Sequence, residues 1–268
     1  MLTLDSVSYR YAGADRPSLH DVDLRLADGD VVGVVGASES GKTTLCLVAS
    51  GLAPRAIRGT LSGRLLIDGE DVADARMHEL MAHTGVCFQD PATQLSGVTG
   101  SVFEEVAFGP MNLGLPLDEV LSRTREALAE LGIDHLSERD PARLSGGQMQ
   151  LVAIGGVLAM RPAHLILDEP TAQLDPAGTL LVADALSRLA TGGSSILITE
   201  QKTDLLARIC DRVLALEQGR VKLSGPADAT LADPGLSSLG VAAPSSVRLR
   251  RSALEAGLDP ARIEAGLL

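Results

Sequence analysis

The sequence predicts an α/β fold built around a mostly parallel β-sheet, and three short apolar runs are the first observation behind this prediction. Val31 to Val35 follows a turn signal, and Leu165 to Leu167 and Ile196 to Ile198 are similar runs. None of them alternates between apolar and polar residues. Each is therefore expected to be a strand that is buried on both faces.

Helical patterns between these runs are the second observation. Asp118 is expected to cap a helix that Gly132 ends. One face of that helix carries Leu121, Thr124, Leu128 and Leu131. Pro176 occupies a position that a first helical turn tolerates, ahead of the stretch from Leu180 to Leu189. Strands that alternate with helices are typical of a parallel α/β sheet.

The two ends of the chain depart from this pattern. Residues 1–30 alternate as half-exposed strands do and predict an antiparallel patch beside the main sheet, whereas residues 213–223 predict a hairpin that turns near Gln218-Gly219. Residues 90–150 are mostly helical and are expected to form a lobe. The predicted division is a domain over residues 1–225, which includes that lobe, and a C-terminal appendage over residues 226–268.

Composition limits the function. Hydrophobic residues make up 45% of the 268, which supports a sizeable core and excludes global disorder. A net charge of −12 and an aromatic content of 2% argue against a nucleic-acid partner, because phosphate binding needs clustered Lys and Arg. Three separated cysteines predict free thiols in a reducing cytosol. The longest apolar run, Leu151 to Met160, has about half the length of a membrane helix, so any action at a membrane is expected to go through a partner.

A phosphate loop follows the first buried run. Residues 36–43 match G-x-x-x-x-G-K-[ST] between a strand and an apolar helical stretch, which is the context that this motif requires. Its backbone N–H groups are expected to face phosphate oxygens, Lys42 to reach the β- and γ-phosphates, and the Thr43 hydroxyl to bind Mg²⁺. The residues assigned to the cofactor here are Gly36, Ala37, Ser38, Glu39, Ser40, Gly41, Lys42, Thr43 and Thr44.

Two neighbouring carboxylates end the second buried run. Asp168 is expected to join the Mg²⁺ shell and Glu169 to face an attacking water as the general base. A further segment, residues 144–148 (Leu-Ser-Gly-Gly-Gln), opens an apolar helix and predicts a second phosphate-binding nest. One chain cannot easily place two such nests on one nucleotide. A head-to-tail dimer can, with the loop of one subunit facing the nest of the other.

Taken in order, these three motifs resemble the ATP-binding subunits of ABC transporters, over about residues 1–225. The resemblance implies ATP and Mg²⁺ as cofactors and a P-loop, RecA-like core with an antiparallel β patch and a helical signature lobe. It implies that Tyr11, or its neighbour Tyr9, stacks on adenine. It also implies that Gln89 reaches Mg²⁺ and that Asp175 contacts the second subunit. From the segment at residues 144–148 it assigns Ser145, Gly146, Gly147 and Gln148 to the nucleotide of the opposite subunit.

One position departs from the family. Gln201 stands where the family places a histidine that contacts the γ-phosphate, and no histidine lies nearby. Glutamine donates hydrogen bonds but carries no imidazolium charge. One hypothesis is a site that binds ATP well and hydrolyses it slowly, on the catalytic residues Lys42, Glu169 and Gln201. The alternative is that Gln201 substitutes adequately for the histidine.

Within the family the chain is most similar to the ATPase subunits of energy-coupling factor importers, which take up vitamins or metal ions. The segments that carry this similarity are residues 89–95, 102–110, 170–175, 200–201 and 243–249. The similarity implies a second ATPase subunit, identical or different, an integral membrane scaffold with a substrate-binding component, and a peripheral position on the cytoplasmic face of the membrane. The alternative function is a soluble or degenerate ABC-type ATP-binding module with no role in transport.

Overall fold

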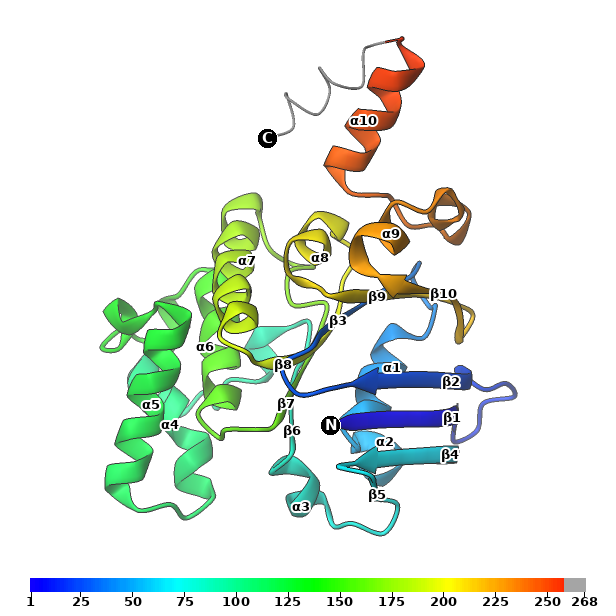
Figure 1. Cartoon of the computed structure of the whole chain (residues 1–268). Coiled ribbons are helices and arrows are strands. Elements are labelled where there is room, and N and C mark those ends of the chain that lie inside the picture. Colours follow the sequence, from blue (N-terminus) through cyan, green and yellow to red (C-terminus); the bar gives the residue numbers. More distant parts are fainter. Residues whose placement is uncertain (258–268) are drawn as a thin grey trace.

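The computed structural model describes residues 1–257, and a six-stranded sheet forms the centre of this part (Figure 1). Its strand order is β10-β9-β3-β8-β7-β6, and all neighbours from β9 to β6 are parallel whereas β10 pairs with β9 antiparallel. The strands are β3 (Val31–Val35), β6 (Thr84–Cys87), β7 (His164–Asp168), β8 (Ser195–Thr199), β9 (Arg212–Glu217) and β10 (Arg220–Pro226). Every residue of β3, β7 and β8 is buried, as the apolar runs predict.

A second, antiparallel sheet packs beside the first, in the order β2-β1-β4-β5. Its strands are β1 (Leu2–Tyr11), β2 (Leu19–Leu26), β4 (Gly59–Ile67) and β5 (Glu70–Asp71). The patch predicted from residues 1–30 is therefore confirmed, but β4 and β5 were not predicted. Leu24 and Leu26 of β2 are buried and Arg25 between them is exposed, which is the period of two that a half-buried strand needs.

Helices α4 (Val102–Asn112), α5 (Leu117–Leu131) and α6 (Gly146–Leu158) lie together on one side of the molecule (Figure 1). Gly132 ends α5 with φ of 68°, as expected. The predicted cap was wrong: Pro116 is the N-cap residue, and Asp118 lies one residue inside the first turn, where its charge still favours the positive helix end. Thr124, Leu128 and Leu131 are buried, as the periodicity predicts, together with Val120 and Ala127, whereas Leu121 is half-buried.

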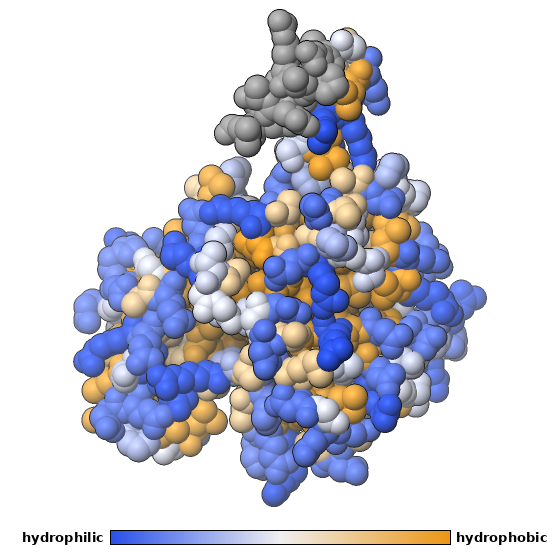
Figure 2. Space-filling model, in the orientation of Figure 1, coloured by the Kyte–Doolittle hydropathy of each residue, from blue (hydrophilic) through white to orange (hydrophobic). Residues whose placement is uncertain are grey.

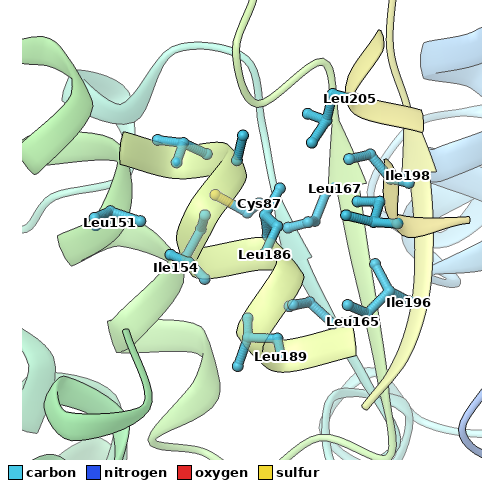
Figure 3. Close-up of a cluster of buried hydrophobic side chains, with 14 of the residues drawn as sticks. Cys87, Leu151, Ile154, Leu165, Leu167, Leu186, Leu189, Ile196, Ile198 and Leu205 are labelled. Carbon is cyan, nitrogen blue, oxygen red and sulfur yellow. The ribbon is translucent and has the colours of Figure 1, made fainter. Parts of the chain in front are cut away.

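Two hydrophobic cores lie on the two faces of the parallel sheet. One packs the sheet against α6, α7 (Pro176–Thr191) and α8 (Thr203–Ile209), and Figure 3 shows its side chains from strands and helices pointing toward one another. The other lies between the two sheets and α1 (Lys42–Ala49). The short helices α2 (Leu52–Arg55) and α3 (Met77–Met81) complete the region between β3 and β6. Because α1 and the sheet are each held by a buried core, the loop between them has a rigid frame.

The C-terminal part begins inside the larger core. Ala227 and Leu231 of α9 (Ala227–Leu231), and then Leu236 and Val241, are buried there. Helix α10 (Ser245–Glu255) has no buried residue and projects from the body (Figure 1). The packed core thus continues past residue 225, and the predicted domain boundary at that position stays a prediction.

Within residues 1–257, no helix is long and apolar enough to cross a bilayer. Figure 2 shows hydrophilic and hydrophobic residues mixed over the viewed face of the molecule. The three cysteines are free thiols, as the sequence predicts.

His164, at the start of β7, is a buried histidine whose two ring nitrogens have no hydrogen-bond partner. Burial lowers its pKa from the usual 6.5. Below pH 6.5 the unfolded chain therefore binds a proton at this histidine more readily than the folded chain does. The free energy of unfolding consequently decreases as the pH is lowered through that range. We expect His164→Leu to reduce the loss of Tm between pH 7.5 and 5.5, measured by thermal unfolding. An equal loss of Tm between pH 7.5 and 5.5 in this variant and in the wild type would show that His164 does not cause the loss of stability.

Candidate nucleotide site

The phosphate loop (residues 36–43) joins the end of β3 to the start of α1 in a tight turn. A Cβ atom on Gly36 would lie 2.3 Å from Ser40 Oγ and 2.6 Å from the carbonyl oxygen of Leu216, so only glycine fits. Gly41 has φ of 109°, a conformation open to glycine, and it is the N-cap residue of α1. The loop backbone and the N-terminal turn of α1 therefore lie next to each other, as they do in anion-binding sites.

Lys42 lies across this loop. Its ammonium group donates hydrogen bonds to the carbonyl oxygens of Gly36, at 2.8 Å, and Ala37, at 3.0 Å. It also forms an ion pair with Glu169, with 3.2 Å between Nζ and Oε1. The lysine is 5% exposed, so little water screens its charge. A buried cation beside a glycine-rich loop is suited to bind a phosphate group.

One pocket brings together residues from distant parts of the sequence. Gln89, Glu169 and Gln201 line it along with residues 38–44, whereas Gly36, Ala37 and Asp168, which the sequence also assigns to the site, are not among its lining residues. Its lining is Ser18, Ser38, Glu39, Ser40, Gly41, Lys42, Thr43, Thr44, Gln89, Glu169 and Gln201. Ser18 was not predicted; it lies in the connection between β1 and β2, and its carbonyl oxygen is 2.9 Å from where a Cβ on Gly41 would be.

Asp168 is buried at the end of β7, and Thr199 Oγ1 donates a hydrogen bond of 2.7 Å to its Oδ1. Burial raises the pKa of the Asp168 carboxyl, although hydrogen bonds from Thr199 and Thr43 act in the opposite direction. The Asp168 carboxylate therefore lies beside the Thr43 hydroxyl, whereas the binding of Mg²⁺ by these two residues stays a prediction. A hydroxyl and a carboxylate that would otherwise be costly to bury suit a hard cation such as Mg²⁺. Thr199 was missed, and its signal was its place at the end of a neighbouring buried strand.

Glu169 has a left-handed backbone, with φ of 47°, which is uncommon for a residue other than glycine. The backbone is held there because Glu169 N–H donates to both the carbonyl and the hydroxyl oxygen of Thr199, at 3.0 Å each. Its carboxylate faces Lys42 on one side and Gln201 on the other. The position of this carboxylate is therefore fixed by backbone and side-chain contacts together.

Gln201 contacts Glu169 directly. Its Nε2 donates hydrogen bonds to Oε1, at 3.2 Å, and to Oε2, at 3.0 Å. The side chain belongs to the turn that follows β8 and it lines the pocket. The residue that the sequence places at the position of the family histidine thus contacts the Glu169 carboxylate and brings no titratable ring to it.

The two candidate tyrosines lie in different environments. Tyr9 is fully buried and donates a hydrogen bond of 2.8 Å to the carbonyl oxygen of Ile57, so it is unable to stack on a base. Tyr11 is half-buried, and its hydroxyl is 3.0 Å from Thr44 Oγ1, beside the pocket. Of the two tyrosines, Tyr11 is therefore the one that is accessible to a base. Its stacking on adenine stays a prediction.

The segment at residues 144–148 lies away from this pocket. Ser145 is the N-cap residue of α6, with Ser145 Oγ accepting from Gln148 N–H and Gln148 Oε1 accepting from Ser145 N–H. Gly147 packs so closely on Gly178 that an added Cβ would lie 2.7 Å from its Cα. Asp175 caps α7 by accepting from Gly178 N–H at 2.7 Å. The nest and the Asp175 loop are therefore neighbours, and neither lines the phosphate pocket.

A phosphate loop after the buried strand β3, a carboxylate pair at the end of β7, two strands away in the sheet, and a separate Ser-Gly-Gly helix start define an ABC-type ATPase cassette. Comparison with known families agrees: the chain belongs to the family described as "ABC transporter", whose model matches residues 19–172.

Named relatives cover most of the chain. A putative ABC transporter ATP-binding protein of Pyrococcus horikoshii is 36% identical over 260 residues, which are 96% of this chain and 91% of that protein. The energy-coupling factor transporter ATP-binding protein EcfA2 of Symbiobacterium thermophilum is 39% identical over 244 residues, 90% of this chain and 82% of that protein. A putative ABC transporter ATP-binding protein of Methanosarcina acetivorans is 42% identical, but this chain spans 36% of its length.

Solved structures show the same fold. CbiO1 from Clostridium perfringens, described as part of the ABC transporter complex CbiONQ, superposes with a TM-score of 0.79 and 32% identity over 94% of each chain. A dimeric bacterial ABC transporter cassette superposes with a TM-score of 0.71 and 26% identity over 85% of this chain and 99% of the other. The predicted mixed α/β fold is thereby confirmed.

Proposed function

We propose that this chain is the ATP-hydrolysing motor subunit of a membrane importer of the energy-coupling factor type, with a vitamin or a metal ion as its cargo. The observation that carries the ATPase is the convergence of Lys42, Glu169 and Gln201 on one pocket. In this proposal Lys42 binds the β- and γ-phosphates, and Glu169 accepts the proton of the attacking water.

Thr43, Gln89 and Asp168 are proposed to hold Mg²⁺ with the nucleotide. The metal ion would neutralise charge on the phosphates. The support from the chain itself is the contact of the Asp168 carboxyl with the Thr43 hydroxyl and the presence of Gln89 in the same pocket. Tyr11 is proposed to lie against the adenine, because its hydroxyl contacts Thr44 and Tyr9 is buried.

The cassette is proposed to work as a head-to-tail dimer. Ser145 and Gly146 are exposed and lie outside the phosphate pocket, so they are available to a nucleotide bound by a second subunit. The dimeric cassette of similar fold supports this arrangement. Asp175, beside Gly147 through Gly178, is proposed to contact the second subunit as well.

Ser145→Arg separates binding from hydrolysis. Because Ser145 does not line the pocket of its own chain, we expect the variant to bind ATP with little change in Kd. It should lose turnover about 10²-fold or more, since a bulky cation blocks the approach of the second subunit and its nucleotide. Fluorescent-ATP binding and steady-state hydrolysis check the two quantities. A parallel loss of affinity would contradict the shared site.

Import rests on the similarity to EcfA2 and CbiO1 and on the segment after Gln89. Asp90 caps a short 3-10 helix, and Gln94 Oε1 accepts a hydrogen bond of 2.7 Å from Phe88 N–H, so this segment is held in a fixed shape beside the pocket. The proposed partners are a second ATPase subunit, an integral membrane scaffold and a substrate-binding membrane component. The chain would lie on the cytoplasmic face of the membrane.

Affinity purification of the tagged chain from solubilised native membranes, followed by mass spectrometry, tests these partners. Recovery of a second ATPase, a multi-helix scaffold and a small hydrophobic membrane protein is expected. Recovery of two large permease subunits with an external binding protein would instead indicate an ABC importer of another type. Ribosomes or nucleic-acid-binding proteins without a membrane partner would contradict a role in transport.

Gln201 is proposed to make the site of this chain slow. Its amide donates hydrogen bonds to Glu169, but it has no charge to offer the γ-phosphate. Loss of one aligned transition-state donor typically lowers the rate on the order of 10²–10³-fold. We therefore expect Gln201→His to raise ATP turnover in the assembled complex, by up to about that factor. Unchanged turnover would show that glutamine is an adequate substitute.

A further inference from the structure

Glu200 is a fully buried carboxylate that does not line the nucleotide pocket. Its Oε2 accepts hydrogen bonds from the hydroxyl of Thr171, at 2.6 Å, and from its backbone N–H, at 3.3 Å. Its Oε1 accepts from the backbone N–H groups of Gln201, at 2.8 Å, and Lys202, at 3.2 Å. Both oxygens are thus bonded twice, which is close to the full capacity of a carboxylate.

These hydrogen bonds connect the two chain segments that carry Gln201 and Glu169, whose side chains contact each other. On one side Glu200 holds the backbone of Gln201, whose amide bonds Glu169. On the other side it holds Thr171, which stands two residues after Glu169 in the chain. A single buried side chain therefore links the segment that follows β7 to the turn that carries Gln201.

Lys202 strengthens the same connection. Its ammonium donates to the carbonyl oxygen of Thr171, at 2.8 Å, and to Thr179 Oγ1, at 2.7 Å. Thr179 lies in the first turn of α7, the helix that Asp175 caps. The turn after β8 is thus tied both to Thr171 and to the helix behind the Asp175 loop.

We propose that Glu200 is a positioning residue for ATP hydrolysis: by holding Gln201 and Thr171 at once, it sets the Gln201 amide against the Glu169 carboxylate. This inference rests on the function proposed above, because it requires Gln201 to act on Glu169 during turnover. It predicts an effect on the chemical step with little effect on nucleotide binding, since Glu200 lies outside the pocket.

The chemistry of the contacts predicts how substitutions rank. Glu200→Ala removes all four acceptor contacts and frees the turn. Glu200→Gln keeps one carbonyl oxygen that can accept from Gln201 and Lys202, and its amide can donate to the Thr171 hydroxyl, which accepts as well as donates. The glutamine variant should therefore retain most of the turnover that the alanine variant loses.

The test is a double-mutant cycle on the full-length chain, purified with the subunits that accompany it. We expect Glu200→Ala to lower kcat about tenfold with little change in KM, the size of a coupling between contacting residues. In a Gln201→Ala background the same substitution should cause no further loss. Glu200→Gln should restore most of the rate, and Glu138→Gln, at an exposed site, should match the wild type.

Several outcomes would overturn the inference: unchanged kcat in Glu200→Ala, an equal loss in the Gln201→Ala background, or a glutamine variant as slow as the alanine variant. If thermal unfolding shows that Glu200→Ala does not fold, Thr171→Val removes one donor at similar volume and takes its place in the cycle. Gln201→Ala alone reports on the proposed role of Gln201. Unchanged turnover there overturns that role, whereas a loss without coupling to Glu200 overturns this inference alone.

Discussion

Glu169→Gln is expected to lower ATP turnover about 10²–10⁴-fold, the usual contribution of a general base, while MgATP still binds. The glutamine keeps the shape of the side chain and removes its ability to accept a proton. Steady-state hydrolysis and fluorescent-ATP binding measure the two effects. Glu138→Gln is the matched control, because it makes the same change in charge at an exposed residue that does not line the pocket.

The same variant is expected to trap the ATP-bound state. If two subunits close around ATP and hydrolysis reopens them, a chain that binds without hydrolysing should accumulate as a closed pair with bound nucleotide. Size-exclusion chromatography with light scattering, with and without MgATP, detects it. Wild-type turnover in Glu169→Gln would mean that another group is the base, and a passive ATP-binding module would show no functional loss.

Lys42→Ala is expected to weaken ATP binding by on the order of 10- to 100-fold. A hydrogen bond to a charged group contributes roughly 1.5–3 kcal/mol, and each 1.4 kcal/mol is about a tenfold change in Kd. The substitution also removes the ion pair with Glu169. The hydrogen bonds from Gln201 to the Glu169 carboxylate are kept. Isothermal titration with a non-hydrolysable ATP analogue measures the Kd.

A matched control for this change is Lys222→Ala, because Lys222 is half-exposed, pairs with Glu217 on the β9–β10 hairpin and does not line the pocket. Its Kd should equal that of the wild type, because a surface ion pair contributes little. Equal Kd values for Lys42→Ala and the wild type would contradict the assignment of the phosphate loop. Thermal unfolding of both variants separates lost binding from lost folding.

The parts of the site that the sequence predicted are those written in short, local motifs. The phosphate loop is specified by glycines that the backbone requires, as the crowding at Gly36 shows. Asp168 and Glu169 follow an apolar strand, and parallel strands end at the same edge of a sheet. The ion pair between Glu169 and Lys42 therefore follows from the fold class together with the strand order, which places one strand, β8, between β3 and β7.

Other contacts depend on segments far apart in the chain. Ser18 reaches the loop, and Thr199 binds Asp168, only because of how the strands are ordered. Tyr9 and Tyr11 lie on the same face of β1, with ring centroids 5.0 Å apart, so the choice between them depends on how far the core extends along that face. Strand β4 was missed because its burial is low and irregular along Gly59–Ile67, so the sequence has no clear period there.

If ATP hydrolysis at Glu169 drives uptake of a cargo, cells without that hydrolysis should lack the cargo. The test compares cells that lack this chain with cells that carry the wild type or Glu169→Gln, and measures vitamins and transition-metal ions in the cells by mass spectrometry. We expect one vitamin or metal to be depleted without the chain and with Glu169→Gln, and to be restored by the wild type. Equal contents in all three would contradict it.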